Sequence, residues 1–161
     1  MRNSRKIMKR VAIALSTLLL VSAVGLAQVT VSLPTATYNF GSTQLLPITV
    51  GTVPAGIISF QTTVTFDPAI VTIAGVTTTG TLSAALNAPV VNTSVAGRIT
   101  IAAAGTSGLS GSGVLIYLNA TMAGKGASAL TFSSFQFNEG TPAATLTNGM
   151  ATVPSLAVKV S

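Results

Sequence analysis

The stretch from Gly56 to Ile73 reads GIISFQTTVTFDPAIVTI and decides the fold of the chain. Positions 58 to 66 alternate, and one set of alternate positions is mostly apolar: Ile58, Phe60, Thr62, Val64 and Phe66. The other set is polar and uncharged: Ser59, Gln61, Thr63 and Thr65. Successive side chains of a β-strand point to opposite faces of its sheet, so the pattern predicts a strand with one buried and one polar face. Asp67-Pro68 then ends the strand, because proline has no N–H to donate to a neighbouring strand.

Further β-like runs fill most of the chain on both sides of this strand. Runs rich in valine, isoleucine and threonine predict strands at 29–33, 45–50, 70–76, 90–95, 98–104, 114–122, 130–137 and 146–153. Connections are expected at 35–43 and 51–56, and also at 105–113, where glycine and serine predict a flexible surface loop.

Smaller irregularities are also predicted. Residues 82–86 are too few for more than one helical turn. A change of parity after Ser133-Ser134 predicts either a β-bulge or a strand buried on both sides. Asn148-Gly149 predicts a tight turn or a kink. Short strands separated by turn residues predict an all-β antiparallel sandwich, either a jelly roll or an immunoglobulin-like fold.

The N-terminal residues 1–27 carry a different pattern. Of the eight basic residues in the chain, five lie in the first ten positions: Arg2, Arg5, Lys6, Lys9 and Arg10. An apolar run from 11 to 24 follows, and then Gly25-Leu26-Ala27. This order predicts a secretory signal peptide cleaved after Ala27, and hence a secreted protein. The alternative is an uncleaved signal anchor at 11–27, which is at the short limit for a membrane-spanning helix and would be the chain's only membrane attachment.

Cleavage would leave a domain at 28–154 and a tail at 155–161, with a nearly neutral charge. Their only charged side chains are Asp67, Arg98, Lys125, Glu139 and Lys159, a net charge of +1. No basic patch remains for a nucleic-acid backbone, so a nucleic-acid partner is not expected. The chain has no cysteine, so its fold must be stable without disulfides.

The same composition excludes most catalytic chemistry. Without histidine or cysteine there is no histidine-based triad, no thiol nucleophile and no usual zinc site. Asp67 and Glu139 are the only carboxylates, so a glycosidase would have to use this one pair as acid and base. We therefore expect no catalytic residue, no metal site, no cofactor and no enzyme activity.

Direct sugar binding stays open as an alternative. Aromatic rings often serve as platforms for sugars, but tryptophan is absent and the only tyrosines are Tyr38 and Tyr117. The six phenylalanines mostly alternate with polar residues at strand spacing, which predicts that they lie in the core.

The stretch GIISFQ, followed by TFDPAI, resembles the third strand of the cohesin domain, where Gly-Ile precedes Phe/Tyr-Asp-Pro-x-Val/Leu. Other segments agree with that family in order, among them GRITI at 97–101, GVL at 113–115 and FNEG at 137–140. The resemblance covers about residues 29–153.

This resemblance implies a nine-stranded jelly-roll sandwich, a fold similar to that of carbohydrate-binding modules. It also implies a secreted, non-catalytic module that binds a dockerin in polysaccharide-degrading assemblies such as cellulosomes, with the calcium held by the dockerin. The partner-binding residues it implies are Ser59 and Gln61, with Thr63 on the same polar face. The alternatives are that these residues are only the solvated side of a strand, and that the module binds carbohydrate directly or is a structural part of the cell surface. Known cohesins carry Asp, Glu and Asn on this face, whereas the strand here has no charge.

Overall fold

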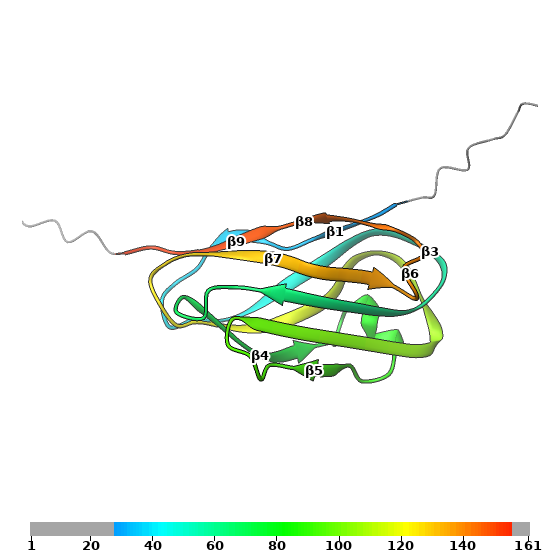
Figure 1. Ribbon diagram of the computed structural model, residues 1–161, viewed down its shortest axis with the longest axis horizontal. Coiled ribbons are helices and arrows are strands. Elements are labelled where there is room, and N and C mark those ends of the chain that lie inside the picture. The colour runs from blue at the N-terminus through cyan, green and yellow to red at the C-terminus, as the bar shows by residue number, and fades with distance from the viewer. Residues whose placement is uncertain (1–27, 156–161) are drawn as a thin grey trace, which may run out of the picture.

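The computed structural model describes residues 28–155, which form nine strands and one short 3₁₀ helix, η1 (Figure 1). The elements are β1 (Val29–Ser32), β2 (Thr35–Thr37), β3 (Thr43–Thr65), β4 (Val71–Thr77), η1 (Leu82–Ala85), β5 (Val90–Asn92), β6 (Arg98–Met122), β7 (Gly126–Phe137), β8 (Ala144–Thr147) and β9 (Gly149–Val153). The predicted signal peptide and residues 156–161 of the predicted tail lie outside the described residues, so these boundaries stay predictions.

Two long strands, β3 and β6, pass through both layers of the sandwich. The first half of β3 pairs with the second half of β6, from Thr43 opposite Thr121 to Val50 opposite Gly113. Its second half pairs with the first half of β6, from Ser59 opposite Ala104 to Thr65 opposite Arg98. Figure 1 shows both ribbons reversing direction at the same end of the molecule. The two layers are therefore joined by a pair of strands that bend together.

The predicted turn at 51–56 and the predicted loop at 105–113 are wrong, because the structure has both segments inside the long strands β3 and β6. Pairing persists through the bend, with Val53 opposite Gly111 and Ile57 opposite Leu109, separated by shifts of register. Gly56 and Gly111 have φ angles of 89° and 84°, which let both chains bend sharply at one place. Leu109 is only 2% exposed, so this segment closes the end of the core and is not a flexible surface loop.

Each layer is completed by shorter strands. The first layer has the order β8-β1-β3-β6-β4, and the second has the order β5-β6-β3-β7-β9-β2. The pairs β1·β8 and β2·β9 are parallel, and every other pair is antiparallel. The predicted all-β sandwich is confirmed, with two parallel pairs added. The short strand β2 lies within the predicted connection 35–43 because its backbone pairs with β9.

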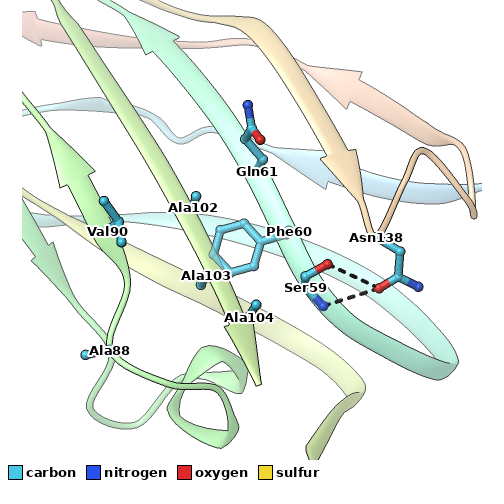
Figure 2. A pocket seen from close by; sticks show the side chains of 9 residues that line it. All are labelled: Ser59, Phe60, Gln61, Ala88, Val90, Ala102, Ala103, Ala104 and Asn138. Carbon is cyan, nitrogen blue, oxygen red and sulfur yellow. Dashed lines mark hydrogen bonds between the residues drawn. The ribbon is translucent and has the colours of Figure 1, made fainter. Parts of the chain in front are cut away.

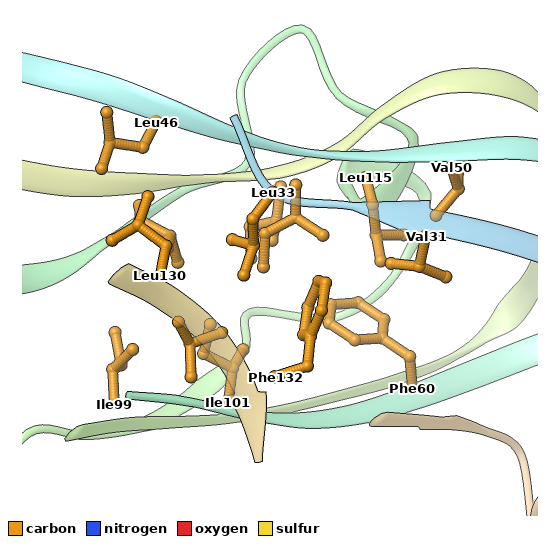
Figure 3. Close-up of a cluster of buried hydrophobic side chains, with 14 of the residues drawn as sticks. Val31, Leu33, Leu46, Val50, Phe60, Ile99, Ile101, Leu115, Leu130 and Phe132 are labelled. Carbon is orange, nitrogen blue, oxygen red and sulfur yellow. The ribbon is translucent and has the colours of Figure 1, made fainter. Parts of the chain in front are cut away.

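The core lies between the two layers (Figure 3). Phe60, Thr62 and Val64 are buried, as the alternation of β3 predicts. Ile58 is 46% exposed, so its predicted burial is wrong. A register shift between Ile57 and Ser59 places Ile57 in the core instead.

Other local predictions agree with the structure. Thr63 pairs with Ser134 and Val64 with Phe132, which leaves Ser133 as the extra residue of the predicted bulge. Asn148 separates β8 from β9, and its Oδ1 accepts the Phe132 N–H at 3.0 Å. The predicted helical turn is η1, while the predicted strand 90–95 is shorter and ends at Asn92.

Candidate functional site

The outward face of the second layer collects the polar side chains of β3. Directly paired residues point to the same face of a sheet, so the pairings of β3, β5, β6 and β7 give the rows of this face. The central row, across the four strands, is Gln136, Gln61, Ala102 and Val90. The next row is Ser134, Thr63, Thr100 and Asn92. These two rows, with the neighbouring pair Ser59 and Ala104, are called the Gln61 face below.

The three predicted binding residues lie together on this face. Ser59 and Thr63 are half-buried, while Gln61 is exposed. The Thr63 hydroxyl is 3.1 Å from the Thr100 hydroxyl, and the Ser59 hydroxyl donates to Asn138 Oδ1 at 3.4 Å. Figure 2 shows the Gln61 side chain projecting from β3. Gln61 is thus the member of the predicted set that exposes an amide, with donors and an acceptor, to solvent.

A shallow depression of about 360 Å³ lies beside Gln61 on this face (Figure 2). Much of its lining is methyl groups, from Ala88, Val90, Ala102 and Ala104. Val90, on the edge strand β5, is 74% exposed. The centre of the Gln61 face therefore combines one amide with an apolar surface.

The described residues contain four charged side chains, and none of them lines this depression. They are Asp67, Arg98, Lys125 and Glu139. Arg98 pairs with Thr65 at one end of the face. Glu139 shares a neighbouring depression with Ser59 at the other end.

Asn138 supports the site, although no role was predicted for it from the sequence. Its φ angle of 42° is in the left-handed region, which asparagine tolerates better than most residues. Its Oδ1 accepts from the Ile58 and Ser59 N–H groups at 3.0 and 3.3 Å, and its Nδ2 donates to the Gly56 carbonyl at 3.1 Å. Asn138 thereby fixes the start of the second half of β3 against the end of β7. An asparagine two residues before a glycine at the end of a strand was the one sequence signal for this role.

An aromatic cluster lies behind β3 and β7. The Phe135 ring makes edge-to-face contacts with Phe137 and Phe132, with distances between ring centroids of 4.8 and 5.9 Å. It stacks on the Phe60 ring at a centroid distance of 6.3 Å. Such pairs are worth about 0.5–1.5 kcal/mol beyond the burial of their surface. The backbone beneath the Gln61 face is therefore held by well-packed side chains.

Phe40 departs from the predicted burial of the phenylalanines. It is 59% exposed, and Lys125 Nζ lies 5.7 Å from its ring centre. These two residues, with Asn39 and Pro154, line a separate depression of about 360 Å³.

The two carboxylates do not form a catalytic pair. Asp67 follows the end of β3, and its Oδ1 accepts the Ala69 N–H at 2.9 Å. Glu139 lies beside Ser59, and the segment of β3 from Ser59 to its end at Thr65 is about 20 Å long. Glycosidase carboxylates are about 5–9.5 Å apart, so these positions do not fit that chemistry.

Among residues 28–155, no cluster of three or more histidine, cysteine or acidic side chains is placed to hold a metal ion. None of the helical segments in that range is long and apolar enough to cross a membrane.

The comparison with known families decides the identity of the fold. A family model for the cohesin domain matches residues 29–157. The chain belongs to the cohesin family. The predicted resemblance and its jelly-roll sandwich are confirmed, and the immunoglobulin-like alternative is set aside.

Solved structures agree with this assignment. The non-cellulosomal cohesin from the hyperthermophilic archaeon Archaeoglobus fulgidus is 20% identical, with a TM-score of 0.68 over 80% of this chain and 93% of the other. CaCohA2 from Clostridium acetobutylicum is 25% identical, with a TM-score of 0.65 over 81% and 93% of the two chains. A chain from the Coh-OlpC–Doc435 complex, a type I cohesin–dockerin complex from Clostridium thermocellum, is 20% identical, with a TM-score of 0.67 over 80% and 95%. No curated protein matches the chain.

Proposed function

We propose that this cohesin domain is a non-catalytic docking module that binds a dockerin-type protein through the Gln61 face. The observation that carries the proposal is the position of Gln61, exposed at the centre of an uncharged sheet face in a domain of the cohesin family. Several structurally similar chains come from cohesin–dockerin complexes, which supports a partner of that class.

The sheet gives the partner a preformed surface. Ordering flexible side chains and loops on binding costs about 0.5–1.5 kcal/mol for each immobilised side chain. Ser59 and Thr63 are already held by hydrogen bonds, and Asn138 fixes the backbone beside them. Little ordering is left to this side of the interface, and the exposed Gln61 amide provides directional hydrogen bonds.

The cellular setting in the proposal rests on the sequence. Residues 1–27 have the pattern of a secretory signal peptide, so we propose that the domain acts outside the cell. The family resemblance supports a role in assembling polysaccharide-degrading enzymes, with the domain itself having no catalytic residues, cofactor or metal.

The first experiment is a pull-down with residues 28–161 against the secreted proteins of the source organism, with and without a calcium chelator. We expect capture of a protein with duplicated calcium-binding loops, and loss of capture with the chelator, because the family resemblance implies that the dockerin holds the calcium. The captured module is then made in pure form for binding measurements.

Gln61→Lys tests the face itself. It places an unpaired charge at the centre of the contact, so we expect the dissociation constant for the captured module to rise at least about tenfold. The matched control is Thr72→Lys on β4, which places the same charge on an exposed position of the first layer. Equal effects of the two variants, or none from Gln61→Lys, would contradict the proposal.

Direct carbohydrate binding remains the second candidate, and one observation favours it. Phe40 is an exposed ring beside Asn39, with Lys125 over it, in a depression away from the Gln61 face. Retention on an insoluble polysaccharide that is lost in Phe40→Ala, together with no capture of a protein, would favour this function.

A further inference from the structure

We propose that the Gln61 face selects a dockerin-type partner whose contact surface is uncharged, with apolar side chains facing the Ala102–Val90 side and neutral polar groups facing Gln61. This inference rests on the proposed docking function and adds the chemistry of the partner. Its basis is the distribution of methyl groups, amides and charges on the face.

The apolar side of the face is built from small side chains on two strands. Ala102 and Ala104 point outward from β6, and Val90 lies opposite Ala102 on β5. Ala88 extends this surface beyond the start of β5. Small side chains leave a shallow depression, not a flat wall, which an apolar side chain of a partner can fill (Figure 2). Removing this apolar surface from water would favour binding.

The polar side offers only neutral groups. Gln61 is flanked on β7 by Gln136, and the next row adds the hydroxyls of Thr63 and Thr100. Amides and hydroxyls both donate and accept hydrogen bonds, so they fit serine, threonine, asparagine or glutamine on the partner. They provide no opposite charge for a lysine or a carboxylate.

A charged side chain docked at the centre would be poorly compensated. Arg98, on β6, lies in the row of Thr65, a backbone spacing of about 13 Å along the sheet from the row of Gln61, and Glu139 lies beside Ser59 at the other end of the face. That distance exceeds the Debye length of about 8 Å at physiological salt, so Arg98 has little effect on the centre. A partner charge there would lose its hydration without gaining an ion pair, which disfavours binding.

The same distribution sets the kinetics of association. Electrostatic steering requires complementary potentials, and the centre of this face carries no charge. We therefore expect association near the unsteered value of about 10⁵–10⁶ M⁻¹s⁻¹, with little dependence on ionic strength.

The test uses residues 28–161 and the purified, calcium-loaded dockerin module identified by the pull-down. The dissociation constant is measured by calorimetry at about 50 mM and about 500 mM NaCl, a range that takes the Debye length from beyond 10 Å to about 4 Å. We expect a change of less than about twofold, whereas an interface dominated by charge pairs would weaken by about tenfold or more.

Ala102→Asp provides a second measurement on the same complex. It places a carboxylate at the centre of the apolar side, and we expect the dissociation constant to rise at least about tenfold. The matched control is Ala74→Asp, on an exposed position of β4 in the first layer, which should leave binding unchanged. The salt measurement uses the unaltered domain and so does not depend on how well a variant folds.

The two levels of the proposal fail in different ways. If no dockerin module binds, the docking function is wrong and the inference falls with it. If a dockerin binds but its affinity falls about tenfold with salt, or Ala102→Asp binds as tightly as the unaltered domain, only the inference of an uncharged partner is wrong.

Discussion

Asn138 shows how a single side chain away from β3 prepares the Gln61 face. Its amide makes hydrogen bonds to backbone groups of Gly56, Ile58 and Ser59, about 80 residues earlier in the chain. These bonds set where β3 resumes its regular pleat after the bend. The positions of Ser59 and Gln61 on the face therefore depend on Asn138 as well as on their own strand.

Asn138→Ala should destabilise the domain by about 1–3 kcal/mol, because it leaves strand backbone groups unpaired and puts a less tolerant residue at a positive φ. Urea unfolding followed by far-ultraviolet circular dichroism measures the loss. The control is Asn92→Ala, whose side chain accepts one local hydrogen bond from the Ser94 N–H. A loss no greater than that of the control would contradict the bracing role of Asn138.

Tyr38 gives the molecule a pH dependence in the alkaline range. Desolvation by burial raises the pKa of Tyr38 above its ordinary value of 10.0. Above pH 10.0 the unfolded chain loses this proton before the folded chain does, so the unfolded state binds fewer protons. The free energy of unfolding should therefore fall as the pH rises from 10.0 through the folded-state pKa. Tyr38→Phe should have a flatter stability profile in that range, and an unchanged profile would show that this tyrosine is not the cause.

Much of the residue-level pattern could be predicted from the sequence. The period of two in β3 places Ser59, Gln61 and Thr63 on one face, because strand geometry alone determines that alternation. Ile58 breaks the rule, since the register of β3 against β6 shifts between Ile57 and Ser59. The hydrogen-bond partners of Asn138 could not be predicted, because they lie far away in the sequence and become neighbours only after folding.

At the scale of elements, the two bent strands are the feature that the sequence did not predict. Glycines at 51, 56, 105, 108, 111 and 113 have the composition of turns and loops. The structure keeps β3 and β6 paired through this region because both chains bend at the same point. Composition shows that a chain can bend, but the partner chain decides whether the pairing continues.

The break between β8 and β9 depends on a close approach of two backbones. A Cβ atom on Gly149 would overlap the Pro34 carbonyl, the group that also accepts the Met150 N–H at 3.0 Å. Gly149→Ala should therefore push β9 away from the chain at Pro34 and destabilise the domain by about 1–3 kcal/mol. Thermal unfolding measures the effect.

Gly75 is the control for this substitution. A Cβ atom there would meet nothing within 4 Å, so Gly75→Ala should be tolerated. If Gly149→Ala is as stable as Gly75→Ala, the close packing of β9 against Pro34 is not a constraint on the fold.

At the scale of the whole molecule, the sandwich separates two tasks. The side chains that point inward from both layers form the core, which contains 26 buried apolar residues. The outward side of the second layer carries the Gln61 face, and the charged side chains of residues 28–155 lie away from its centre. A neutral, rigid and partly apolar face is suited to binding another protein, and the separation of Asp67 from Glu139 does not fit hydrolysis of a glycosidic bond.

The most direct test of this account is a map of the bound surface by methyl NMR. Residues 28–161 are labelled at alanine and valine methyl groups, and the calcium-loaded dockerin module is added. We predict that the signals of Ala102, Ala104 and Val90 shift, while that of Ala74, exposed on β4 in the other layer, stays in place. Shifts confined to Ala74 and its neighbours, with the Gln61 face unchanged, would contradict the central claim that this cohesin domain docks its partner through that face.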